Sequence, residues 1–223
     1  MSAYPSPNCG ERRGGVTPSL IVLHYTGMAT CAEARARLCD PLAEVSAHWL
    51  ISELGEVEAL VPEDRRAWHA GAGEWAGITD VNSHSIGIEL ANTGDAPFPE
   101  PQMAALEGLL TGIMARWDIP ARGVIGHSDM APTRKRDPGP RFDWRRLAVQ
   151  GLSVWPEPCA ADLGCIWDNL RSFGYPEAPE ADLLTAFRLR FRPWGRGPIE
   201  GVDAGMAADL AVRFGAQGRS KAT

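Results

Sequence analysis

The chain has no apolar stretch of about 18 residues, so the sequence predicts no segment that crosses a bilayer. It also lacks an excess of basic residues, since 22 lysines and arginines stand against 28 acidic residues, for a net charge of −6. This balance argues against nucleic acid as a partner and against binding to anionic membranes. With 223 residues, 44% of them hydrophobic, the chain suits an ordinary soluble protein with one main domain and a smaller one.

Cysteine is scarce and irregularly spaced. The five cysteines are odd in number and form no CxxC pair, so a disulfide scaffold is not expected and reduced thiols are predicted. Residues 1–18 contain no apolar core of a signal peptide, and no such core precedes Cys9 to suggest a lipid anchor. We therefore expect a cytoplasmic protein, with the periplasm, or export by an unrecognised route, as the alternative.

The most informative run extends from Gly126 to Pro140. His127 and Asp137 bracket a short tether stiffened by prolines, and Lys135 lies two residues before Asp137. Because a proline follows Asp137, extended backbone is favoured there, and residues i and i+2 of an extended chain point to the same side. Two potential metal ligands beside a cation are typical of a site that binds zinc and stabilises a reacting oxygen. The alternative is a surface loop whose His and Asp cap local backbone.

Two predicted strands offer further polar groups. His24 lies in the apolar run 19–25, a strand buried on both faces, and is the best candidate for the third ligand of a hydrolytic zinc site. In the run 85–90, Gly87 and Glu89 lie opposite three aliphatic residues, and Gly87 would keep the surface open. Glu89 could move a proton from a metal-bound water to a leaving nitrogen. A core histidine and a solvent-facing carboxylate are the alternatives.

In this order, five stretches resemble the type-2 class of zinc-dependent N-acetylmuramoyl-L-alanine amidases, whose fold is shared with peptidoglycan recognition proteins. The stretches are LIVLHYT at 20–26, VSAHWLI at 45–51, RAWHAG at 66–71, NSHSIGIEL at 82–90, and GHSDMAP at 126–132 with KRDPGP at 135–140. They cover most of residues 16–150, and their combination is far more specific than any one of them. No catalytic position of the family is substituted.

The resemblance implies one Zn²⁺ per chain, held by His24, His127 and Asp137. It implies Glu89 as the catalytic proton carrier and Lys135 as the residue that stabilises the oxyanion. The expected reaction is hydrolysis of the amide between the lactyl group of N-acetylmuramic acid, ordinary or 1,6-anhydro, and L-alanine of the stem peptide. Muropeptides released in peptidoglycan turnover or recycling are the expected partners.

Three further residues are candidates for substrate binding. His69 matches a family position near the cleft, Tyr25 directly follows a predicted ligand, and Arg66 is one of several arginines that could meet the carboxylates of a stem peptide. Packing and solvated surface are the alternatives for these side chains. Two other functions also remain possible at this point: a non-catalytic peptidoglycan recognition protein, and a zinc peptidase or deacetylase acting on another bond of the same polymer.

The expected fold is α/β (α+β), with a central mixed sheet flanked by helices. Strands are predicted at 19–25, 47–52, 56–61, 85–90 and 123–126, and helices near 30–39, 102–117 and 142–148. We expect a catalytic domain at 1–150, a linker at 151–158, and a three-helix module at 159–218 with helical patterns at 159–173, 180–191 and 203–214. The module resembles a peptidoglycan-binding module joined to such amidases. It could bind muropeptides or buttress the catalytic domain.

Overall fold

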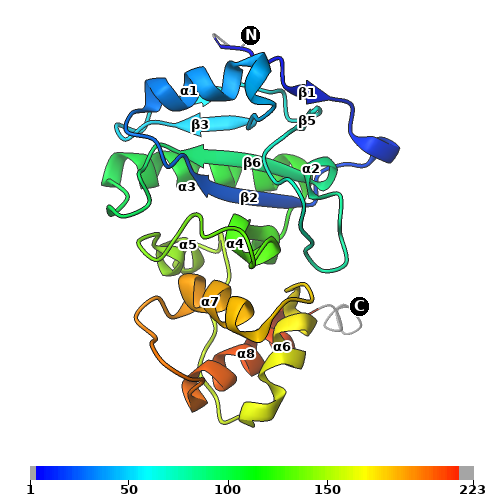
Figure 1. Ribbon diagram of the computed structural model, residues 1–223, viewed down its shortest axis with the longest axis vertical. Helices are drawn as coiled ribbons and strands as arrows, with labels where there is room; N and C mark the ends of the chain where they lie inside the picture. Colours follow the sequence, from blue (N-terminus) through cyan, green and yellow to red (C-terminus); the bar gives the residue numbers. More distant parts are fainter. Residues whose placement is uncertain (1–3, 216–223) are drawn as a thin grey trace.

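The computed structural model describes residues 4–215 and is built around a five-stranded sheet in the order β4–β3–β6–β2–β7 (Figure 1). Strands β2 (Leu20–Tyr25), β3 (Trp49–Ile51), β6 (Ser85–Leu90) and β7 (Val124–Gly126) are parallel, and β4 (Val57–Ala59) is an antiparallel edge strand. The mixed sheet and its five strands are confirmed. The carboxyl ends of β2, β6 and β7 therefore meet at one edge.

One face of the sheet is lined mainly by aliphatic side chains. Ile21 and Leu23 of β2 point toward α3 (Glu100–Trp117), whose residues Leu106 and Leu110 pack against them in one buried cluster. Alternate strand residues point to opposite faces, so the aliphatic side chains of β6 lie on this same face. The spacing of the apolar residues in α3 matches one stripe of a helix, and this stripe covers the sheet as predicted.

The C-terminal helices α6 (Ile166–Phe173), α7 (Glu180–Phe191) and α8 (Gly201–Phe214) gather below the sheet in Figure 1, beyond α4 (His127–Met130) and α5 (Trp144–Val149). Helices α7 and α8 lie where the sequence predicted them, whereas α6 begins at Ile166, later than the predicted start at 159. Leu20 and Val22 of β2 share one continuous buried cluster with residues of these helices. The helices therefore extend the core of the sheet.

The segment 151–158, expected as a linker, is packed along much of its length. Leu152, Ser153 and Val154 are buried, and Leu152 and Val154 belong to the clusters on the two faces of the sheet. Burial of this kind is unlike the exposed polar linkers that separate independent domains. The segment joins the C-terminal helices firmly to the rest of the chain.

Helices α1 (Cys31–Cys39) and α5 (Trp144–Val149) also form where the sequence predicted helices. Shorter elements escaped the sequence analysis because tertiary contacts, rather than periodicity, define them. They are β1 (Cys9–Gly10), η1 (Arg13–Gly15), η2 (Pro41–Ala43), β5 (Arg66–Ala67), α2 (Val81–His84), η3 (Ala121–Gly123), α4 (His127–Met130) and η4 (Leu163–Cys165). Strands β1 and β5 pair with each other in a separate two-stranded sheet.

Two expectations from composition can be compared with the structure. No disulfide joins any of the five cysteines, all of which lie within the described residues. Among residues 4–215, no helix is both long enough and apolar enough to cross a membrane.

Candidate active site

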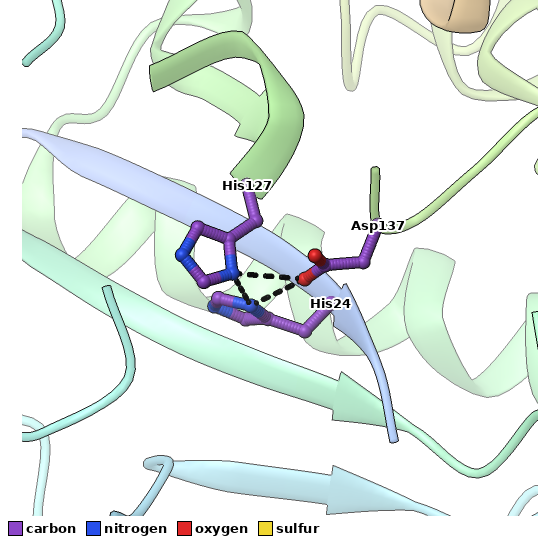
Figure 2. A group of neighbouring side chains, drawn as sticks. All are labelled: His24, His127 and Asp137. Atoms are coloured by element: carbon purple, nitrogen blue, oxygen red, sulfur yellow. Dashed lines mark hydrogen bonds and ion pairs between the residues drawn. The ribbon is translucent and has the colours of Figure 1, made fainter. Parts of the chain in front are cut away.

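The three predicted metal ligands converge at the carboxyl edge of the sheet. His24 is near the end of β2, and His127 directly follows β7, the strand beside β2. Asp137 comes from the loop after α4. Figure 2 shows the three side chains pointing toward one another. The Nδ1 atoms of the two histidines are 2.9 Å apart, and each lies 2.9 Å from Oδ2 of Asp137. All three residues are buried. The two histidines come together because β2 and β7 are adjacent parallel strands whose carboxyl ends lie at the same edge of the sheet.

A backbone carbonyl sets the tautomer of His127. Its Nε2 lies 2.9 Å from the carbonyl oxygen of Ala70, which can only accept, so Nε2 carries the hydrogen and Nδ1 of the neutral ring has a free lone pair. Asn82 holds the turn that presents this carbonyl, because its Oδ1 accepts from the backbone N–H groups of His69 and Ala70. The guanidinium of Arg134 also donates to the carbonyl of Ala70.

A chain of hydrogen bonds sets the tautomer of His24 in the same way. The Ser85 hydroxyl donates to the carbonyl of Val81, so its oxygen is left to accept from Nε2 of His69 at 3.2 Å. His69 Nδ1 must then accept from Nε2 of His24, 3.1 Å away, which leaves the lone pair on Nδ1 of His24. Both histidines therefore turn a bare nitrogen toward the carboxylate.

Electrostatics agrees with these assignments. Burial, and then the neighbouring His127, lowers the pKa of His24 to about 4, so the ring is neutral at pH 7. Burial alone would raise the pKa of Asp137, but the close contacts of its carboxylate with the imidazoles of His127 and His24 outweigh burial and hold that pKa well below its usual range. Two neutral imidazoles and one carboxylate with converging lone pairs repel one another unless a cation lies between them. This donor set fits a divalent metal of the zinc type, with a position open for water.

Glu89 lies beside this trio. It is in register with His24 on the adjacent parallel strand, so both side chains occupy the same face of the sheet. Its Oε2 is buried and has no hydrogen-bond partner within residues 4–215. Burial, and then the charge of Asp137, raises the pKa of Glu89 well above its usual value, against the opposing charge of Lys135. A buried carboxylate oxygen without a partner is a candidate for proton transfer.

A pocket of about 500 Å³ opens over these groups. It is lined by all of the predicted site residues except Arg66, namely His24, Tyr25, His69, Glu89, His127, Lys135 and Asp137. Lys135 and Asp137 line the same pocket, as their two-residue spacing predicted. Trp68 and Arg37, which the sequence analysis did not single out, complete parts of the wall. Trp68 falls within a matching stretch of the sequence, whereas nothing local marks Arg37.

Two expectations differ from the structure. Arg66 does not line the pocket, and its guanidinium lies 3.3 Å from the carboxylate of Asp80 instead. Gly87 does not leave an open surface for substrate. A Cβ at this position would lie 2.4 Å from the ring of His69, so the glycine makes room for that ring. Both differences arise from contacts between segments that are separate in the sequence.

Comparisons with known proteins agree with this geometry. Residues 14–140 match the Amidase_2 family, described as N-acetylmuramoyl-L-alanine amidase. The chain belongs to this family and is an amide hydrolase. It is 34% identical over 232 residues to the N-acetylmuramoyl-L-alanine amidase AmiD of Escherichia coli, a match that covers 88% of this chain and 83% of AmiD. The 1,6-anhydro-N-acetylmuramyl-L-alanine amidase AmpD of E. coli is 35% identical over 162 residues, which cover 65% of this chain and 88% of AmpD.

Solved structures show the same fold. The complex of E. coli AmiD with the substrate anhydro-N-acetylmuramic acid-L-Ala-D-γ-Glu-L-Lys has a TM-score of 0.76 at 30% identity, and it covers 99% of this chain and 93% of its own. AmpDh3 of Pseudomonas aeruginosa in complex with anhydromuramic pentapeptide has a TM-score of 0.81 at 28% identity, and it covers 92% of this chain and 95% of its own. The family match ends at residue 140, so α6–α8 lie beyond it, but the alignment with AmiD spans them as well.

Proposed function

We propose that this chain uses a zinc ion held by His24, His127 and Asp137 to hydrolyse the amide between the lactyl group of 1,6-anhydro-N-acetylmuramic acid and L-alanine in soluble muropeptides. The observation that carries the proposal is a triangle of ligand atoms: Nδ1 of His24, Nδ1 of His127 and Oδ2 of Asp137 lie 2.9 Å from one another. Beside it lies Oε2 of Glu89, which has no hydrogen-bond partner among residues 4–215. The anhydromuramyl peptides in the AmiD and AmpDh3 structures support the choice of sugar. The cytoplasmic location expected from the sequence stays a prediction.

The chemistry divides between the metal and this chain's own residues. Zinc supplies Lewis acidity when it is bound, which lowers the pKa of water to about 7 and polarises a carbonyl. Glu89 accepts a proton from the attacking water and delivers it to the nitrogen that departs with the stem peptide. Burial raises the pKa of Glu89 above its usual value, so its carboxylate accepts a proton more readily than an exposed glutamate does. Lys135 offers a positive charge to the carbonyl oxygen as negative charge develops on it, a contribution typically worth about 3–4 kcal/mol.

For His69, the contacts favour a positioning role over direct substrate binding. Both of its ring nitrogens are occupied, one by His24 and the other by Ser85. We assign it the task of holding the His24 ring and its tautomer, in the way that outer hydrogen bonds orient metal-binding histidines. Tyr25 lines the pocket and remains the candidate for contact with substrate.

The test is digestion of defined muropeptides that carry either the anhydro or the ordinary sugar, followed by mass spectrometry of the products. We expect release of the intact stem peptide from the anhydro form, loss of this release with a chelator, and recovery on addition of Zn²⁺. Glu89→Gln is the matched control, because it keeps the size of the side chain and removes the proton carrier. A chain that binds both muropeptides and releases neither stem peptide would be a recognition protein instead, and the proposal would be wrong.

A further inference from the structure

Asp129, two residues after His127, is fully buried and tied to the C-terminal helical region. Its Oδ1 accepts from the hydroxyl of Tyr175 at 2.7 Å, and its Oδ2 accepts from Nη1 of Arg190 in α7 at 2.7 Å. The same Oδ2 accepts from the backbone N–H of Gly126 at 2.8 Å, which closes the first turn of α4. One carboxylate thus joins the helix that carries His127 to the C-terminal helices.

Arg190 is among the most completely buried charged residues of the described chain, with 1% of its side chain exposed. Besides Asp129, its guanidinium donates to the carbonyl of Val124 in β7 at 2.9 Å and to Ser153 at 3.3 Å. It also stacks on the ring of Trp144, 4.4 Å from the ring centroid. A buried ion pair is weak evidence for stability, because the cost of removing both charges from water offsets their attraction. Its placement therefore points to a positioning task.

A second contact reaches the other end of the same segment. Arg136, the residue before Asp137, lies 3.6 Å from the carboxylate of Asp182 in α7. Met130 of α4 is fully buried in the cluster that contains Phe187 of α7. Helix α7 therefore contacts the segment 127–137 near both of its proposed metal ligands.

Helix α4 has only four residues, and so short a helix has little stability of its own. The direction of the His127 side chain must come from tertiary contacts. We propose that the C-terminal helices complete the metal centre, with Arg190 and Tyr175 as positioning residues that fix His127 through Asp129. This inference rests on the proposed metal centre, and it resolves the choice between wall binding and buttressing in favour of buttressing the site itself.

The experiment compares zinc affinity, by competition with a chelator, in the full chain and in four variants. Arg190→Met removes the charge and its hydrogen bonds, Arg190→Lys restores the charge, and Tyr175→Phe removes only a hydroxyl group. Arg188→Met is the matched control, because Arg188 lies on the same helix and forms a similar buried pair with Asp203 at 2.6 Å, away from the segment 127–137. The absorption spectrum of the Co²⁺-loaded protein reports ligand geometry independently of activity.

We expect Arg190→Met to weaken zinc binding about tenfold, at the lower end of the range for outer hydrogen-bond partners of metal ligands, and to alter the cobalt spectrum. Arg190→Lys should recover part of the loss, and Tyr175→Phe should weaken binding by a smaller factor than Arg190→Met, because it removes only one hydrogen bond to Asp129. Arg188→Met should keep the wild-type affinity and spectrum even where its unfolding temperature falls.

Wild-type affinity and spectrum in folded Arg190→Met would overturn the inference and leave the metal centre standing. If Arg190→Met does not fold, Tyr175→Phe decides, because its ring retains the packing against Trp75. Unchanged zinc affinity in that variant would also overturn the inference. A wild-type chain without zinc affinity would instead refute the proposed metal centre, and this inference with it.

Discussion

The two faces of the central sheet are built differently. The face toward α3 is covered by aliphatic side chains such as Leu106 and Leu110. The other face carries His24 and Glu89 at its carboxyl end. Beside this site, Leu20 and Val22 share a buried cluster with the C-terminal helices, and the buried pair of Arg190 and Asp129 joins α7 to α4. Both faces bury apolar side chains, but the polar groups of the candidate site lie on the second face alone. Side chains on the α3 face therefore contribute to stability without contacting the site.

The largest effect should follow from removing groups on the polar face. Asp137→Ala should lose both tightly bound zinc and activity, because two imidazoles alone make a poor site. Glu89→Gln should keep zinc and lose about 10²–10⁴-fold in kcat, the usual contribution of a positioned proton carrier. Metal analysis and kinetics of the two purified variants check this. Full activity in Glu89→Gln would contradict the assigned proton transfer.

Lys135→Met should lower kcat by about 10²–10³-fold, because a charge that stabilises the developing oxyanion acts mainly in the transition state. Zinc content should not change, and KM should change little. The charge control is Arg141→Met, which removes an exposed cation just after Pro140, six residues from Lys135. Equal losses in the two variants would mean that general attraction of an anionic substrate accounts for the effect.

The opposite outcome is expected on the apolar face. Leu106→Ala should lower the free energy of unfolding by about 2–5 kcal/mol, because it removes a fully buried side chain and leaves a cavity. Zinc affinity and kcat at 25 °C should stay at wild-type values. Leu54→Ala, at a position that is 78% exposed, should change stability by less than about 0.5 kcal/mol. Denaturant titration measures the free energy of unfolding, and zinc competition measures the affinity for the metal. A loss of zinc affinity in Leu106→Ala would show that the α3 face also shapes the metal site.

The smallest effect concerns Glu89 and pH in the metal-free protein. Its folded-state pKa is raised by burial, so the charged form is disfavoured on folding. Its contribution to stability is therefore intact below the unfolded pKa and falls as pH rises toward the folded pKa. Glu89→Gln should raise the unfolding temperature at pH 8 by about 2–4 °C, the shift that 1 kcal/mol produces in a chain of this size, and have little effect at pH 4. An equal gain at both pH values would contradict ionisation as the cause.

Much of the fold could be predicted from local pattern. Alternation in the run 85–90 and the stripe of α3 depend on residues a few positions apart, so periodicity was enough to place them. The two-residue spacing of Lys135 and Asp137 was enough to place both in one pocket. Arg66 and Gly87 were harder because their surroundings come from distant segments. Arg66 forms an ion pair with Asp80, and the ring of His69 fills the space beside Gly87.

The sequence by itself determined the strands, the main helices, and the presence of two imidazoles, two carboxylates and a lysine in an order that matches the amidase family. Only the tertiary structure decided which nitrogen of each histidine faces the site, because the hydrogen bonds of Ser85, His69 and Ala70 set the tautomers. It also decided that α7 contacts the helix of His127. The reason is physical: Arg190 and Asp129 are 61 residues apart in the chain, and no local pattern specifies a contact across that separation.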